Sequence, residues 1–121
     1  MLKKITLFTF CILLFSIISP AQYSMQNLTV YDCYGNLTDS ESNPIIGTYY
    51  SHNENYTFTI CPPGAITIDI FFIFFETEPT FDYLRIFDGP DTNSPLIGGP
   101  FSGINLPPSI SSNGCITINF I

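Results

Sequence analysis

Two carboxylates close together in the chain, Glu78 and Asp82, are the first residues that could do chemistry. Paired carboxylates catalyse glycoside hydrolysis, but only their closeness in sequence favours that interpretation here, and no pocket-forming motif accompanies them. His52 is the only histidine, and it lies in a polar stretch without a Ser/His/Asp or Cys/His set. Asp88-Gly89-Pro90-Asp91 indicates a turn rather than a metal loop. The residues therefore predict that the chain is not an enzyme.

The cysteines are the second reactive set. Cys11 lies in an apolar N-terminal run, which leaves Cys33, Cys61 and Cys115, and disulfides are the default in a secreted chain. Pairing Cys33 with Cys61 would remove about 3 to 4 kcal/mol of loop entropy from the unfolded state. Cys115 would then be either a buried free thiol or bonded beyond the end of the chain. We expect the second, because the chain stops inside an expected strand.

The N-terminus has the layout of a secretion signal. Two lysines precede an apolar run, residues 5–18, and the small residues Ser19 and Ala21 precede Gln22. The alternative is a membrane anchor, but a run of this length spans about 21 Å as a helix, short of the roughly 30 Å hydrocarbon core. We therefore expect residues 1–21 to be a signal peptide and 22–121 a single secreted domain that is not inserted in a membrane.

Composition narrows the class of protein. Beyond the signal, ten acidic residues accompany one lysine or arginine, Arg85, so the formal net charge is −9 and a nucleic-acid partner is excluded. Hydrophobic residues make up 45% of the chain, too many for disorder. Abundant Ile, Phe, Tyr and Thr, together with many Pro and Gly, favour an all-β domain.

Alternating hydrophobicity predicts the strands. Residues 65–75 alternate strictly at first, with Ile66, Ile68 and Ile70 on one face, and become apolar on both faces, which predicts a long strand in the middle of a sheet or under a loop. Further strands are expected at 55–61 and 83–87, and shorter ones at 25–31, 96–97, 109–111 and 115–121. Short strands separated by Pro, Gly and Asn clusters predict an antiparallel β-sandwich or jelly roll.

The order of these features resembles the CUB domain, a secreted β-sandwich module. The resemblance covers residues 33–121 and is most specific in Phe72-Ile-Phe-Phe-Glu-Thr-Glu78-Pro-Thr-Phe-Asp82-Tyr-Leu-Arg-Ile-Phe-Asp-Gly89. It implies a CUB-like jelly roll in which the strand ending at Cys61 closes the first disulfide.

Two departures from the family pattern carry further expectations. The second disulfide of many animal CUB domains is missing, since Thr80 and Phe101 stand near its positions, so the chain looks more like the modules of large secreted bacterial proteins. In those, the late cysteine, here Cys115, would pair near the end of the domain. The family's last strands are also missing after Ile121, so we expect an incomplete domain with unpaired sheet edges, taken from a larger parent chain.

A calcium-binding subset of the family implies a metal site. Carried over by position, its glutamate and aspartate are Glu78 and Asp82, and Tyr50 resembles the tyrosine that orients the glutamate. A third carboxylate ligand of that subset is absent from this chain. Because Ca²⁺ takes six to eight oxygens, a turn that gathers carboxylates and carbonyls suits it. The alternative is that Asp82 caps its own loop while Glu78 is merely solvated.

The resemblance implies a secreted binding or adhesion module, extracellular or at the cell surface, that recognises an extracellular protein or a glycan, with Ca²⁺ as its cofactor. In the alternative, the module is the targeting appendage of a secreted peptidase or other hydrolase whose catalytic part lies further along the parent chain. A structural spacer in a surface adhesin is the third interpretation.

Overall fold

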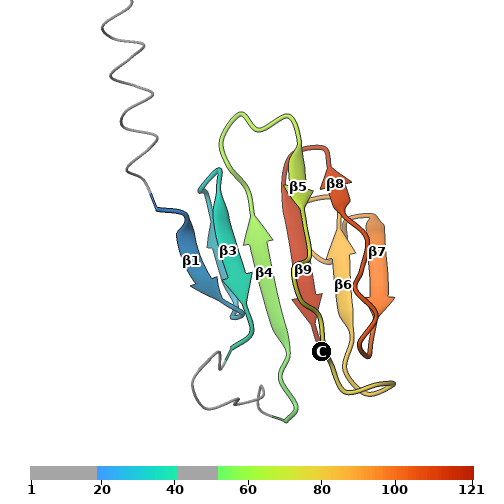
Figure 1. Ribbon diagram of the computed structural model, residues 1–121. Coiled ribbons are helices and arrows are strands. Elements are labelled where there is room, and N and C mark those ends of the chain that lie inside the picture. Colours follow the sequence, from blue (N-terminus) through green and yellow to red (C-terminus); the bar gives the residue numbers. More distant parts are fainter. Residues whose placement is uncertain (1–18, 41–51) are drawn as a thin grey trace, which may run out of the picture.

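The computed structural model describes residues 19–40 and 52–121, and this part of the chain contains strands and no helix (Figure 1). No helix in it is long and apolar enough to cross a membrane. The strands are β1 (Ala21–Ser24), β2 (Leu28–Val30), β3 (Gly35–Thr38), β4 (Tyr56–Ile60), β5 (Ile68–Ile70), β6 (Leu84–Phe87), β7 (Leu96–Phe101), β8 (Ile110–Ser112) and β9 (Ile116–Phe120).

One layer is a five-stranded sheet with the order β2-β4-β9-β6-β7. Its centre, β9, pairs antiparallel with β4 and with β6, and Ile118 lies opposite both Phe58 and Ile86. All five residues of β9 are buried, because strands flank it on both sides and both of its faces are covered.

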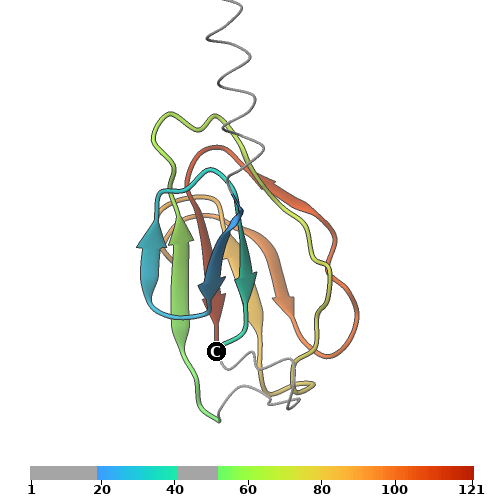
Figure 2. The ribbon, with the colours of Figure 1, turned by 60° about the vertical axis from the view of Figure 1, so that its left-hand side comes forward.

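The second layer consists of two separate pairs, β1–β3 and β5–β8, which lie over the five-stranded sheet (Figure 2). The predicted all-β sandwich is thus confirmed. Two pairs of neighbouring strands, β1–β3 and β2–β4, are parallel rather than antiparallel. This follows from the path of the chain: it changes layer at each turn from β1 to β2 to β3, so alternate strands share a layer and run in the same direction.

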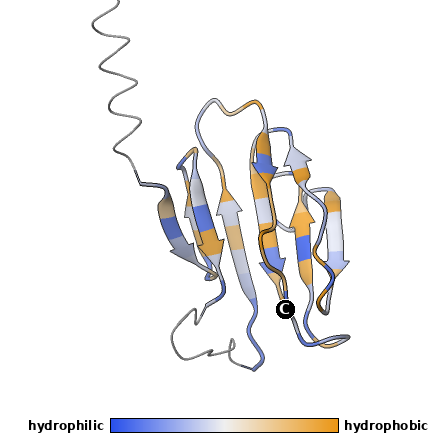
Figure 3. Ribbon diagram, in the orientation of Figure 1, coloured by the Kyte–Doolittle hydropathy of each residue, from blue (hydrophilic) through white to orange (hydrophobic). Residues whose placement is uncertain are grey.

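The core fills the space between the layers in two clusters. Tyr23 and Leu37 from the β1–β3 pair cover Phe58 and Ile118, and Ile110 from β8 covers Ile86. Figure 3 shows apolar colour on β6 and β9 and also along the segment that follows β5. Burying side chains of this size is worth about 1.5 to 3 kcal/mol each, and this holds the layers together.

The long strand expected at residues 65–75 is the main difference from prediction. Only Ile68–Ile70 form a strand. The reason is that β8 pairs with β5 over three residues and that no other strand within residues 19–40 and 52–121 pairs with β5. Beyond it Phe71, Ile73 and Phe74 are 73%, 90% and 77% exposed. A pattern of side chains predicts which face is apolar, whereas the length of a strand depends on how far its partner extends.

Candidate functional site

The predicted carboxylates Glu78 and Asp82 lie on the loop that joins β5 to β6, at the lower edge of the molecule in Figure 1. Glu78 is exposed and Asp82 is half-buried. The backbone N–H groups of Phe81 and Asp82 donate to the Glu78 carbonyl at 3.2 and 3.1 Å, which closes one turn between the two acids. The structure therefore places both carboxylates on a single tight turn.

A second loop, after β7, clasps this turn. The backbone of Thr77 donates to the Gly103 carbonyl at 3.0 Å, and the N–H of Gly103 donates to Thr77 Oγ1 at 2.9 Å. The N–H of Thr80 donates to Ser102 Oγ at 2.9 Å, and that hydroxyl donates to the Glu78 carbonyl at 3.3 Å. These contacts join residues more than 20 positions apart, so the sequence carried no signal for Thr77 or Ser102. They restrict the conformations open to the acidic turn.

Backbone conformation explains part of this geometry. Gly103 has φ = 87°, a region that L side chains rarely adopt, and its amide must face Thr77. Thr80, at the tip of the turn, has φ = 69°, uncommon for a β-branched residue. The bond from its amide to Ser102 and the bond from the Tyr83 hydroxyl to its carbonyl, at 2.9 Å, hold it there.

The two carboxylates do not by themselves form a calcium site. In residues 19–40 and 52–121 no group of three His, Cys, Asp or Glu side chains is arranged to hold a metal ion. The Glu78 carbonyl already accepts three hydrogen bonds and is a poor candidate ligand. Two carboxylates give fewer oxygens than the six to eight that Ca²⁺ takes, so a calcium site at this turn would need further ligands. Tyr50, the predicted supporting residue, lies outside the described residues.

The disulfide differs from the prediction. Cys61 is bonded to Cys115, and Cys33 is an exposed free thiol. Both the expected Cys33–Cys61 bond and the expected partner for Cys115 beyond the chain are therefore wrong. The reason is strand register: Ile60 lies opposite Ile116, so the next antiparallel pair is Cys61 with Cys115, whose Cα atoms are 4.3 Å apart. Register is set by pairing between distant segments, and spacing along the chain does not reveal it.

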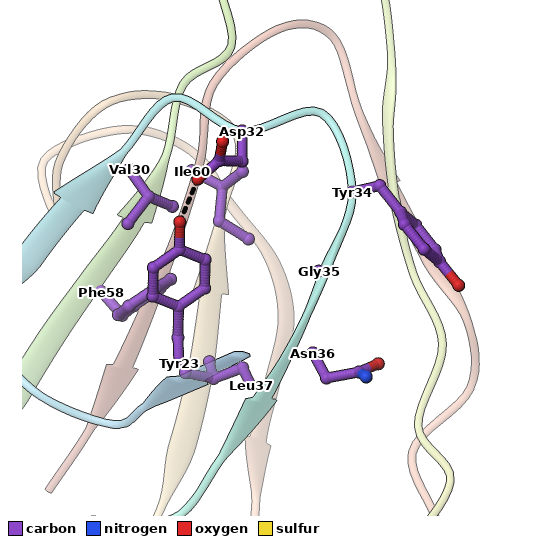
Figure 4. A pocket seen from close by; sticks show the side chains of 9 residues that line it. All are labelled: Tyr23, Val30, Asp32, Tyr34, Gly35, Asn36, Leu37, Phe58 and Ile60. Atoms are coloured by element: carbon purple, nitrogen blue, oxygen red, sulfur yellow. Dashed lines mark hydrogen bonds between the residues drawn. The ribbon is translucent and has the colours of Figure 1, made fainter. Parts of the chain in front are cut away.

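The end of the sandwich opposite to this turn carries one perturbed group. The hydroxyl of Tyr23 donates to the carboxylate of Asp32, as Figure 4 shows. This hydrogen bond, followed by desolvation and by the nearby negative charge, raises the pKa of Tyr23 above its usual 10.0.

Comparison with known proteins agrees with this fold. No family model matches the chain. It is 32% identical to rat (Rattus norvegicus) cubilin over 97 residues, which is 73% of the chain and 3% of cubilin. It is 30% identical to rat multiple epidermal growth factor-like domains protein 8 over 111 residues, 84% of the chain and 4% of that protein. The chain thus spans a small fraction of these relatives. Together with the β-sandwich, these matches support the resemblance to the CUB domain.

Proposed function

We propose that this domain is a non-catalytic extracellular binding module that recognises a protein or a glycan through the clasped turn around Glu78 and Asp82. One observation carries the proposal: two loops from distant parts of the chain are hydrogen-bonded into one frame, and that frame presents the two acidic side chains. On the same two loops Phe81 and Ile104 are 72% and 75% exposed. Acidic and apolar groups on a restrained surface are suited to recognition with little loss of conformational entropy.

Calcium is the second part of the proposal. Glu78 and Asp82 would hold the ion, with Tyr50 orienting the glutamate and oxygens from outside the described residues completing the shell. A bound Ca²⁺ would add positive charge to a turn that carries two acidic side chains.

The calcium proposal is tested by the thermal unfolding of the purified chain in Ca²⁺ and in chelator. We expect Ca²⁺ to raise the melting temperature of the unsubstituted chain. We expect the same for the control Glu76→Gln, which changes an exposed carboxylate two residues from Glu78. We expect no increase in Glu78→Gln. Equal melting temperatures of the unsubstituted chain in millimolar Ca²⁺ and in chelator would contradict the metal site.

The binding proposal is tested separately. The chain is applied to a glycan array and to immobilised collagen, fibronectin and laminin, beside Phe81→Ser. We expect capture by at least one surface, and at least a tenfold loss of affinity in the variant without a change in melting temperature. Absence of capture on every surface, or full capture by Phe81→Ser, would count against recognition by this turn.

A further inference from the structure

The second layer of the sandwich is discontinuous where the first layer is continuous. In the described part of the chain, β3 pairs only with β1, and β5 pairs only with β8, whereas the facing layer has five adjoining strands. The sides of β3 and β5 that face each other are therefore two sheet edges without a partner strand. Figure 1 shows both strands running in the same direction, so one inserted strand could run antiparallel to both.

A groove lies between these edges. It consists of two adjoining cavities of about 50 and 380 Å³ that share Asp32 and Ile60 in their walls. Leu37 on β3 lines the first and Ile68 on β5 lines the second, so the groove reaches from one edge strand to the other. Its floor is apolar: Phe58, which Figure 4 shows beneath Tyr23, is 1% exposed.

The rim of the groove is acidic. Asp32 and Asp69 are exposed carboxylates in its walls, and each accepts a hydrogen bond from a neutral hydroxyl, that of Tyr23 or of Ser111. Arg85 is the single lysine or arginine of the described residues, and its guanidinium lies over the ring of Tyr83, 5.9 Å from the centroid. The rim thus presents negative charge that no lysine or arginine of the described chain neutralises.

We propose that this groove binds an extended peptide of a partner protein as an added β-strand, with alternating apolar and basic side chains. The backbone of the peptide would hydrogen-bond to the edges of β3 and β5, and its apolar side chains would point to the floor around Ile60. Its lysines or arginines would lie at the rim beside Asp32 and Asp69. The groove is remote from the Glu78–Asp82 turn, so this proposal stands independently of the proposed function.

The test uses a fluorescent eight-residue peptide of alternating valine and lysine, and anisotropy to measure its affinity for the purified chain. We expect saturable binding that Asp32→Asn and Asp69→Asn each weaken by about two- to fivefold, as for exposed charge pairs. The matched control is Asp91→Asn, an exposed carboxylate in the turn between β6 and β7, which should leave affinity unchanged. Equal affinities in all three variants would overturn the proposal.

Two further measurements separate strand addition from general attraction to an acidic protein. Replacing alternate valines of the peptide with proline removes backbone donors while keeping the charge, and we expect binding to be lost. Cys33 lines the larger cavity as an exposed free thiol, so bound peptide should slow its alkylation at least fivefold. Undiminished binding of the proline peptide, or unchanged alkylation at saturation, would overturn the proposal. If the chain forms a dimer through this groove, the occupant is a second copy of the chain. If Cys33 is protected from alkylation in a longer chain without added peptide, the occupant is another part of that chain. Either result would equally overturn the proposal.

Discussion

At the scale of single residues, buried polar side chains on the outer face of the five-stranded sheet connect its parts. Thr117, on the central strand, is fully buried; its hydroxyl donates to the Gly89 carbonyl at 2.7 Å and lies 3.0 Å from the hydroxyl of Thr59. Asn119, two residues on, donates to the carbonyl of Tyr56 at 3.1 Å. These bonds join β9 to the turn after β6 and to β4, and because Thr117 and Asn119 are themselves buried, water does not readily replace them.

The substitution Thr117→Val tests this network. Valine keeps the shape of threonine and removes the hydroxyl, so the Gly89 carbonyl loses its buried donor. We expect the free energy of unfolding in urea to fall by about 1 to 3 kcal/mol. The matched control Thr29→Val, at an exposed position of β2, should change the free energy of unfolding by no more than about 0.5 kcal/mol. Equal effects at the two positions would mean that the hydroxyl of Thr117 contributes nothing specific.

Tyr23 gives a pH prediction. Its pKa in the folded chain is raised mainly by the bond to Asp32, so the stabilisation is present below pH 10 and is lost as pH rises through the folded-state pKa. The tyrosinate absorbance of Tyr23 is obtained as the difference between the titration of the unsubstituted chain and that of Tyr23→Phe. We expect this absorbance to develop above pH 10. In Asp32→Asn it should develop at lower pH. Identical titration curves in the two backgrounds would show that Asp32 does not act on Tyr23.

At the scale of elements, the position of β9 decides the disulfide and the site. It pairs with β4 on one side and β6 on the other, which brings Cys115 opposite Cys61. It also fixes the end of the acidic loop, because Tyr83 and Ile121 exchange backbone hydrogen bonds of 2.7 and 3.1 Å at the start of β6. A single central strand thus orders both ends of the sandwich.

Removing the disulfide measures its contribution. Its two cysteines are 54 residues apart, and closing a loop of that length stabilises the folded state by about 4 kcal/mol in the chain-entropy model. We expect a loss of that order in the double variant Cys61→Ser/Cys115→Ser, measured by urea denaturation, and little change in Cys33→Ser. Peptide mapping without reduction checks the pairing directly, and a Cys33–Cys61 peptide would contradict the structure.

At the scale of the whole molecule, strong acidity coexists with exposed apolar groups. The chain has a formal net charge of −7 and a sequence pI of about 4.1. Its exposed side chains include Ile66, Phe71, Ile73 and Phe74 along the segment around β5. At neutral pH, repulsion between like-charged molecules opposes association through this surface.

Solubility should therefore depend on pH. As pH falls from 7 toward 4 the net charge approaches zero, and we expect light scattering to show growing particles at constant protein concentration. The double variant Phe71→Ser/Phe74→Ser should scatter less at pH 4, because it removes two exposed rings. If the scattering of the unsubstituted chain does not change with pH, charge repulsion is not what keeps the molecules apart.

The sequence by itself determined the class of fold and the position of most strands. Alternation and turn residues are local signals, and they placed β4, β6 and β9 and put Glu78 and Asp82 on one loop. The tertiary structure alone decided which residues meet. It joined Cys61 to Cys115, ended β5 at Ile70, clasped the acidic turn with Ser102 and Gly103, and left the edges of β3 and β5 facing each other. Each of these depends on the register and extent of strands far apart in the chain, and side-chain periodicity carries no information about either.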